Sequence, residues 1–330
     1  MIHIYYIYNI YNILKIDANY LSYIFSLHEL SFQMAFYTDA LVNNDGADEE
    51  LQQILGNPAQ IDVKVWSSSE QGGRPYQEDV CLVSRKNDTG ISIVGCADGH
   101  KYPDAPNDAA NFAGTMFLSM LANGLNLDDG MPNDQIAELV RRLFHAGNEH
   151  LRSMIPECKS GTTISLVIIV GNRLIACSLG DSDLLIEYFD GSFHHSTYHI
   201  PGNGDERKRI RAAGGSVLEG RVYNPSDRSN VSVSRALGDF QFPGIIPEPD
   251  VTIHHLHEVK TVCCLTDGVR ERLNDDYPMQ SELEIKKILM HIANEAIAHG
   301  QDPAVVLTKY AVKGRSCADN ASAVILSFSS

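Results

Sequence analysis

Two short, predominantly apolar runs in this 330-residue chain, 91–97 and 261–266, each end directly in an Asp-Gly dipeptide. The first delivers Asp98 and the second delivers Asp267. Short apolar runs bounded by turn residues are typical of strands that are buried on both faces. An acid at the end of such a strand is poorly solvated, which destabilises its charged form unless a positive group lies beside it. The fold therefore has to bring both acids to a cation.

A third acid has the same kind of position near the C-terminus. Asp319 and Asn320 immediately precede the strand-like run 321–326, and an antiparallel neighbour would bring this carboxylate to the same rim as the other two. Clustered carboxylates raise one another's pKa, and their hard oxygen atoms suit Mg²⁺ or Mn²⁺. A single Asp-Gly or Asp-Asn pair is also a common turn sequence, so the interpretation depends on the whole set. Together the three acids predict a site for a divalent cation.

The segment 73–79, which opens another strand, adds two acids and an arginine. Glu78 and Asp79 follow Arg74 closely in this segment. A guanidinium group is planar and can bind a phosphate through two hydrogen bonds, whereas the alternative for Arg74 is an ordinary surface or ion-paired side chain. The segment therefore extends the acidic cluster and supplies a candidate phosphate ligand.

The charge balance and the N-terminal stretch exclude two classes of partner. The formal net charge is −16 at pH 7, and nucleic-acid binding rests mainly on lysine and arginine side chains that neutralise phosphates. We therefore predict no nucleic-acid partner. The uncharged stretch 1–14 is too short to span a bilayer and has no basic region or small-residue cleavage site, so we predict neither a signal peptide nor stable membrane insertion.

Turn-forming clusters at 43–46 and 56–58 divide the chain into two parts. We predict an N-terminal extension over 1–60, poorly ordered or partly untranslated with Met34 as the working start, and one catalytic domain over 61–330. A content of 44% hydrophobic residues is enough for one large core. We expect a monomer that is located in the cytoplasm, with the nucleus as the alternative location.

The apolar patterns predict strands and helices that are separated along the chain. Strands are expected at 61–66, 80–84, 91–97, 162–170, 173–179, 184–189 and 321–328, with others around Val231, Val251 and Thr261. Helices are expected at 109–121, 135–151, 281–299 and 303–312. The three strands between 162 and 189 are expected to form an antiparallel meander. Because strands cluster apart from helices, the fold class is a layered α+β fold without alternating βαβ units.

These residues form part of a series that resembles the type 2C, metal-dependent serine/threonine protein phosphatases (the PPM type) over most of 61–327. The matching blocks, in family order, are Gly73-Arg74-x-x-x-Glu78-Asp79, Asp98-Gly99-His100, Ser160-Gly-Thr-Thr163, Gly180-Asp181-Ser182, Glu206-x-x-Arg209-Ile210-x-x-x-Gly214-Gly215-x-Val217, Val233-Ser-Arg-Ala-Leu-Gly-Asp239, Pro247-Glu-Pro-Asp250, Thr266-Asp-Gly268 and Asp319-Asn320. Any one block is a weak signal, but the ordered series is specific. The resemblance implies an antiparallel β-sandwich flanked by helices, four layers in the order αββα, with a two-metal centre at one end.

The resemblance also implies the ligands of that centre. Asp98 would bridge two Mg²⁺ or Mn²⁺ ions, and Asp267 and Asp319 would complete the first ion's ligands. The carbonyl of Gly99 would bind the second ion. Three further acids would contribute, two largely through water and the last at a weaker third ion: Glu78, Asp79 and Asp181. Two metals can lower the pKa of a water molecule and hold a phosphoryl group for in-line attack, so no covalent enzyme intermediate is required.

Two residues would act on the substrate, which the resemblance implies is a phosphorylated protein. Arg74 would clamp the phosphate. His100 would be the general acid that protonates the departing serine or threonine oxygen, and the alternative is a turn histidine satisfied by a neighbouring carboxylate.

The chain departs from the family pattern at three places beside this centre. The segment 101–106 replaces the two glycines that usually follow the histidine. Asp183 replaces the arginine common after Gly-Asp-Ser, and Arg270 replaces a frequent aromatic residue and could pair with Glu271 or with substrate. Glu271 itself stands where the family often has aspartate, which bears most on the third metal ion.

Several other features favour structural roles. Histidine pairs at 194–195 and 254–255 face opposite sides of a strand, so we do not predict zinc. Ser165 and Ser234 lack a nucleophile pattern, and the cysteines in apolar runs are expected to be buried, reduced thiols: Cys81, Cys96, Cys177, Cys263 and Cys264. Two other functions remain alternatives, a catalytically silent phosphatase-fold adaptor and a metal-dependent phosphodiesterase or nuclease, of which the acidic balance disfavours the second.

Overall fold

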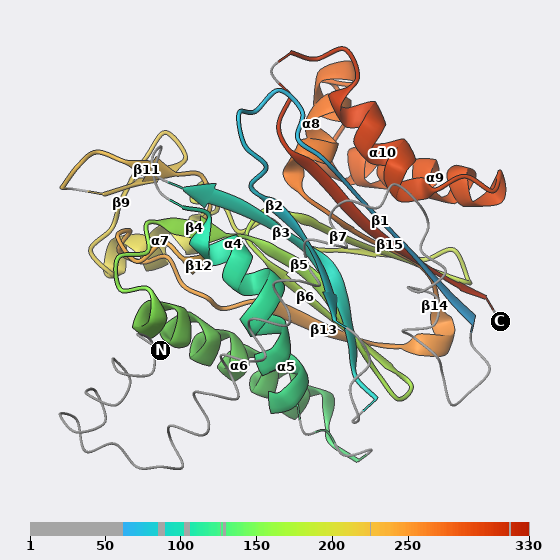
Figure 1. Cartoon of the computed structure of the whole chain (residues 1–330), viewed down its shortest axis with the longest axis horizontal. Coiled ribbons are helices and arrows are strands. Elements are labelled where there is room, and N and C mark those ends of the chain that lie inside the picture. The colour runs from blue at the N-terminus through green and yellow to red at the C-terminus, as the bar shows by residue number, and fades with distance from the viewer. Residues whose placement is uncertain are drawn as a thin grey trace, which may run out of the picture. The chain divides into compact units, whose positions relative to one another are not determined.

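The computed structural model describes residues 62–84, 90–101, 106–125, 127, 130–224, 226–316 and 318–329, all of which lie in the compact unit Ala47–Ser330 (Figure 1). The predicted N-terminal extension, 1–60, and the first residue of the predicted domain, Ile61, lie outside the described residues. Among the described helices, none is long and apolar enough to cross a membrane.

One sheet carries the first acid-bearing strand near its centre. Its path is β12-β4-β3-β5-β6-β13, with β2 paired to β3, and all the pairings are antiparallel. The strands are β2 Asp79–Ser84, β3 Ser92–Lys101, β4 Ser160–Thr162, β5 Ile164–Val170, β6 Arg173–Leu179, β12 Leu237–Gly238 and β13 Asp250–His255. Strands β3 and β5 are buried along most of their length, which explains why their sequences are apolar without alternating.

The second sheet carries the other two acids at neighbouring strand ends. Its order is β1-β15-β14-β7-β8, again antiparallel. The strands are β1 Asp62–Glu70, β7 Asp183–Tyr188, β8 Phe193–His195, β14 Val259–Leu265 and β15 Ala321–Ser329. Leu265 at the end of β14 lies opposite Ala323 near the start of β15. This register confirms that the antiparallel neighbour brings the third acid to the same rim.

Three apolar clusters hold four layers together. One packs the first sheet against α4 Asp108–Phe112, the π-helical turn η1 Ala113–Phe117, α5 Leu118–Gly124 and α6 Asn133–Met154. A second lies between the sheets, and the third packs the second sheet against α8 Asp267–Asp276, α9 Glu282–Ala298 and α10 Pro303–Val312. Figure 1 shows these helix groups on the two outer faces. The predicted four-layer αββα sandwich is confirmed.

Local sequence explains where the outer helices begin. Helix α9 starts at a capping box, because the hydroxyl of Ser281 accepts from the backbone N–H of Glu284 and the Glu284 carboxylate accepts from the N–H of Ser281. Helix α10 starts at Asp302, which accepts from two backbone N–H groups, and has proline at its first position. Helix α6 buries Ile136, Val140 and other residues at three and four spacing.

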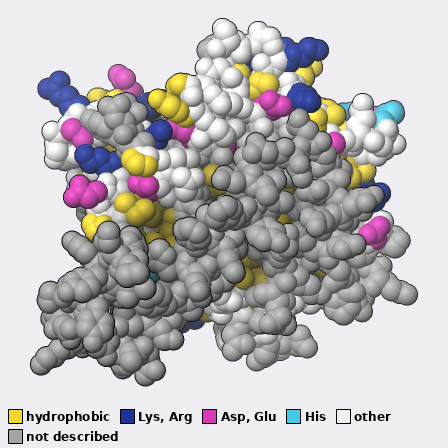
Figure 2. Space-filling model, viewed as in Figure 1, with side chains coloured by type: hydrophobic (Ala, Val, Ile, Leu, Met, Phe, Trp, Pro, Cys, Tyr) yellow, Lys and Arg dark blue, Asp and Glu magenta, His cyan; other side chains and the backbone are white. Residues whose placement is uncertain are grey.

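A small subdomain adjoins the sandwich. It contains α7 Gly204–Ala212 and a three-stranded sheet in the order β11-β10-β9, with β9 Ser216–Leu218, β10 Arg221–Tyr223 and β11 Asn230–Val231. Its apolar cluster is centred on Ile210 and Val222. On the face seen in Figure 2, basic and acidic side chains are interspersed over this subdomain.

Four details of secondary structure differ from the predictions. The meander is wrong at its last strand, because β6 belongs to one sheet and β7 to the other, so the chain crosses between sheets at Gly180-Asp181. The strand predicted at 91–97 continues to Lys101, because β4 pairs with its end. The helix predicted at 109–121 is interrupted by η1. Helix α8, which the apolar pattern did not indicate, begins at Asp267 itself.

The thiols and hydroxyls have the structural roles that the sequence indicated. Of the five cysteines that the sequence singled out, four are buried free thiols and one, Cys81, is partly buried. The hydroxyl of Ser165 donates to the carbonyl of Asp183 at 2.7 Å, and that of Ser234 donates to Glu206 at 2.5 Å. Both hydroxyls are therefore occupied by structural hydrogen bonds.

Candidate active site

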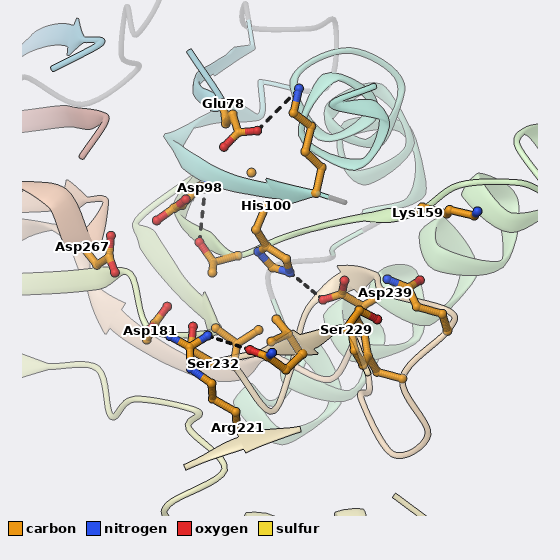
Figure 3. A pocket seen from close by; sticks show the side chains of 18 of the residues that line it. Glu78, Asp98, His100, Lys159, Asp181, Arg221, Ser229, Ser232, Asp239 and Asp267 are labelled. Atoms are coloured by element: carbon orange, nitrogen blue, oxygen red, sulfur yellow. Dashed lines mark hydrogen bonds and ion pairs between the residues drawn. The ribbon is translucent and has the colours of Figure 1, made fainter. Parts of the chain in front are cut away.

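A pocket at one end of the sandwich contains nearly all the predicted site residues (Figure 3). Its lining includes Arg74, Glu78, Asp98, Gly99, His100, Asp181, Asp267 and Asp319. Asp79 is not part of the lining; it is buried and is the direct cross-strand partner of Asp98. In Figure 3, Asp98, Asp181 and Asp267 lie on one side of His100, and Asp239 lies on the other.

Asp98 is fixed by hydrogen bonds to its backbone. Its carbonyl accepts from the N–H of Thr163 and from the hydroxyl of Thr162, each at 3.0 Å. The N–H of Asp98 donates to the hydroxyl oxygen of Thr163 at 3.3 Å. These contacts explain the Thr-Thr pair of the Ser160–Thr163 block, because they hold the acid-bearing end of β3 in place.

The glycine after Asp267 is required by a close approach of the backbone. A Cβ atom at Gly268 would lie 1.9 Å from the carbonyl oxygen of Asn320 and 3.2 Å from the Cβ of Asp319. Any other residue would push the start of α8 away from the start of β15. The Asp-Gly dipeptide therefore lets two carboxylates from different strands reach one pocket.

Asn320 positions the segment that carries the arginine and two of the acids, a role the sequence did not assign. Its side-chain oxygen accepts from the N–H of Glu78 at 2.8 Å. Its amide nitrogen donates to the carbonyls of Gln71 at 2.7 Å and Tyr76 at 3.0 Å. Its place directly after Asp319 was the only sequence signal for this role.

Burial and mutual repulsion raise the pKa values of the clustered acids. The pKa of Asp98 is raised well above its usual value by burial and then by the charges of Asp267 and Asp79. Burial raises the pKa of Asp79 to about 7, although the Thr266 hydroxyl donates to its carboxylate at 2.8 Å. Burial and the charge of Asp267 raise the pKa of Asp181 to about 6. The cluster therefore needs more positive charge than the protein supplies.

Two side-chain cations neutralise part of this cluster. Arg74 pairs with Asp319, and the ammonium of Lys101 lies 3.6 Å from a carboxylate oxygen of Glu78. Within the described ranges, no three His, Cys, Asp or Glu side chains are already arranged around one point. The donor set nevertheless fits a hard divalent cation, because it consists of poorly solvated carboxylate oxygens from neighbouring strand ends.

His100 forms a short ion pair that the sequence did not assign. Its Nε2 lies 2.6 Å from Oδ2 of Asp239, whose side chain is almost fully buried. Burial alone would lower the pKa of His100, but the charge and hydrogen bond of Asp239 outweigh it and raise the pKa. A Cβ atom at Gly161 would lie 2.3 Å from the Asp239 carboxylate and 2.5 Å from Nε2 of His100. Gly161 therefore leaves the space in which this pair forms.

The family model for protein phosphatase 2C matches residues 67–307 of the chain. The chain belongs to the protein phosphatase 2C family. It is a metal-dependent protein serine/threonine phosphatase, and the silent-adaptor alternative is not favoured. A Paramecium tetraurelia protein named "Probable protein phosphatase 2C 3" is 28% identical over 231 residues, which cover 64% of this chain and 74% of the relative.

Solved phosphatase structures share the fold of this phosphatase 2C. A serine-threonine phosphatase 2C from Toxoplasma gondii has a TM-score of 0.62 at 18% identity, covering 83% of this chain and 96% of that one. The catalytic domain of the phosphatase PstP, described as in complex with two manganese ions, has a TM-score of 0.51 at 19% identity, covering 82% of this chain and all of the other. These likenesses agree with the αββα sandwich.

In this phosphatase 2C, the residues that depart from the family pattern contact protein groups. Arg270 pairs with Asp183 at 2.8 Å and not with Glu271, which corrects one expectation for it. Glu271 lies 3.7 Å from the guanidinium of Arg315. Of the altered segment 101–106, only Lys101 and Pro106 are among the described residues. Arg270 therefore pairs with one of the departing residues, and Arg315 lies beside another.

The histidine-rich segments lie away from this pocket. The rings of His194 and His254, from the two different sheets, have centroids 4.9 Å apart. Burial lowers the pKa of both, that of His254 to about 4. His254 also contacts the hydroxyls of Tyr188 and Thr252, each at 2.8 Å. Hydroxyl groups thus satisfy the ring of His254, and the two histidines form a polar contact between the sheets.

We expect Asp79→Asn to stabilise the metal-free phosphatase increasingly as the pH rises from about 4 to about 7. Burial raises the pKa of Asp79 from its usual value of 3.8 in the unfolded chain to about 7 in the folded protein. Between these values the folded state holds a proton that the unfolded state has lost, so the free energy of unfolding of the wild type falls by about 1.4 kcal/mol per pH unit. Asparagine keeps the acceptor for Thr266 but does not titrate.

Urea unfolding of both proteins in EDTA at several pH values would measure this difference. The gap between variant and wild type should grow up to about pH 7 and then stay constant. A gap that is the same at every pH would contradict the assignment of the raised pKa to Asp79.

Proposed function

We propose that the pocket hydrolyses phosphoserine and phosphothreonine side chains of proteins with two divalent cations, Mg²⁺ or Mn²⁺. The observation that carries this proposal is the meeting of three strand-end carboxylates, Asp98, Asp267 and Asp319, in one pocket with Arg74 and His100. The two manganese ions of the PstP complex support the number of ions.

The proposed ligands are those that the family resemblance implies. Asp98, Asp267 and Asp319, together with the carbonyl of Gly99, would hold the two ions. Divalent cations bound there lower the pKa of water and offset the negative charge of the phosphoryl group. Glu78 lines the pocket and Asp79 is buried outside its lining, and by the family resemblance both would act largely through water.

The reaction breaks the bond between phosphorus and the serine or threonine oxygen, and water supplies the new oxygen on phosphorus. Arg74 binds the phosphoryl oxygens; its side chain is 49% exposed, so the guanidinium can turn from Asp319 to an incoming phosphate. His100 gives its proton to the departing side-chain oxygen, and Asp239 keeps the imidazole protonated until that step.

Phosphate release from a phosphothreonine peptide by the full 330-residue protein tests the proposal. We expect turnover with Mn²⁺ or Mg²⁺ and none with EDTA. If a folded protein gave no turnover with either metal, a silent phosphatase-fold binding protein would be the better description.

We expect His100→Gln to lower kcat for a phosphothreonine peptide by about 100-fold to 10,000-fold, because the alkoxide must then leave without a proton donor. The loss should be much smaller for p-nitrophenyl phosphate, whose leaving group is stable as an anion. Equal losses of kcat on both substrates would contradict the role of His100 as general acid.

Asp239→Asn should move the basic limb of the pH profile of kcat to lower pH, because the Asp239 carboxylate raises the pKa of His100.

The proposed phosphatase has two separate parts, the extension 1–60 and the catalytic domain 61–330. It acts on phosphorylated proteins as a monomer. Its proposed location is the cytoplasm, with the nucleus as the alternative. It has no nucleic-acid partner, in keeping with its net charge of −16.

A further inference from the structure

Two residues that depart from the family pattern contact each other beside the active site. Asp183, the first residue of β7, stands in place of an arginine, and Arg270, in α8, stands in place of an aromatic residue. Nη1 of Arg270 donates to Oδ2 of Asp183 at 2.8 Å, and the side chain of Asp183 is fully buried. The two departures therefore form one buried ion pair between a strand and a helix.

The surrounding side chains fix this pair in place. The hydroxyl of Tyr198 donates to the other oxygen of Asp183 at 2.6 Å, and the guanidinium carbon of Arg270 lies 4.3 Å from the centroid of the Tyr198 ring. The ammonium of Lys286, which is fully buried, lies 3.7 Å from Asp183 and 3.9 Å from the same ring centroid. Asp183 thus has two cationic neighbours, and the position of the guanidinium is set by packing on both sides.

The same guanidinium reaches the loop that carries Asp181. Nη1 of Arg270 donates to the backbone carbonyl of Asp181 at 3.1 Å. Asp181 and Asp267 are both close enough for their charges to interact with that of Arg270. A cation fixed by the protein therefore stands beside the acids at one corner of the pocket.

The second acid that the family resemblance links to a third metal ion also has a cation beside it. Glu271 follows Arg270 on α8, and its carboxylate lies 3.7 Å from the guanidinium of Arg315. Arg315 also pairs with Asp275 at 2.7 Å. The two acids that the family resemblance assigns to a third metal ion, Asp181 and Glu271, are thus each accompanied by an arginine.

We propose that Arg270 is a positioning residue that supplies the positive charge beside Asp181 in place of a third divalent cation. It holds the Asp181 loop through the backbone carbonyl and repels a further dication from the same corner. The centre then binds two divalent ions, with Asp181 outside the ligand set. This inference rests on the proposed metal-dependent function.

Counting bound Mn²⁺ by isothermal titration calorimetry on the full 330-residue protein tests the inference. We expect two ions in the wild type. The paired variant Asp183→Asn with Arg270→Met removes both charges of the pair together, and the buried Lys286 keeps Glu282 as its partner at 2.7 Å. It should bind a third ion at least about tenfold more tightly than the wild type does, because the guanidinium that donates to the Asp181 carbonyl at 3.1 Å has been removed from the site. Adding Asp181→Asn to the paired variant should abolish that third ion.

Two matched variants separate the possible failures. Arg270→Lys keeps the positive charge, so it should still bind two ions. If the arginine acted only through its planar guanidinium, lysine would not be expected to replace it. Asp98→Asn should lose binding of the two ions; if it does not, the proposed metal centre is wrong in itself and this inference fails with it. A wild type that binds a third ion through Asp181, or a folded paired variant that still binds only two, would overturn the inference while leaving the proposed function intact.

Discussion

Asp98→Asn is expected to reduce phosphatase turnover by at least about 1,000-fold. The side chain lies at the centre of the acidic cluster, and an amide removes the negative charge that would hold two cations together. The shape of the side chain is retained. Loss of turnover would therefore reflect loss of cation binding and not loss of packing.

The metal-free stability of the same variant supplies an independent check. The folded-state pKa of Asp98 is raised well above its usual value, so its ionisation opposes folding at neutral pH. Asp98→Asn should therefore unfold at higher urea concentration than the wild type in EDTA while losing activity with Mn²⁺. The control is Asp190→Asn on the exposed turn after β7, where asparagine retains the acceptor for the N–H of Ser192, so both quantities should be unchanged. An active Asp98→Asn enzyme would refute the proposed ligand set.

Glu206→Ala is expected to destabilise the fold by about 3 kcal/mol, the lower end of the cost of breaking a buried ion pair, because Arg235 keeps Asp250 as a second partner at 3.2 Å. Glu206 binds Arg235 at 2.7 Å, Arg209 at 2.6 Å and the hydroxyl of Ser234 at 2.5 Å. Burial would raise its pKa, but these three partners outweigh burial and lower the pKa to about 2. Alanine would remove the one carboxylate that joins α7 to the segment leading to β12.

Urea unfolding at neutral pH measures this effect, and the neighbouring Asp205→Ala provides the control. Asp205 is 97% exposed and pairs only at the surface with Lys208, so its removal should change the free energy of unfolding by less than about 1 kcal/mol. Similar losses from the two variants would show that the buried network contributes little. Because the folded-state pKa of Glu206 is lowered, its contribution should persist at neutral pH and fade as the pH falls towards 2.

The sequence was sufficient to predict the acidic centre because the relevant signals are local. An apolar run predicts a buried strand, and the residue that follows it must lie at a sheet edge. Asp98 and Asp267 were found this way, and the antiparallel pairing of β14 with β15 then brings Asp319 to the same edge. The chain also carries enough ordered motif blocks to predict the family and its sandwich from residue types and their order alone.

The exchange of strands between sheets could not be predicted from the same patterns. The turn at Gly180-Asp181 has the composition of a hairpin, yet β6 and β7 lie in different sheets. A short glycine-containing turn suits either connection, because the choice depends on which distant strands offer free edges. Strand β7 pairs with β14, far along the chain, through Leu184 and Cys264 among others.

The chemical groups of the site and the fold that carries them follow from the amino-acid sequence, because both depend on residue type and on spacing along one strand or turn. Which of these groups meet depends instead on how the layers pack. His100 pairs with Asp239, which follows it in the chain by 139 residues, and Arg270 of helix α8 pairs with Asp183 of strand β7. Such contacts arise from the packing of whole layers, and no local pattern records them.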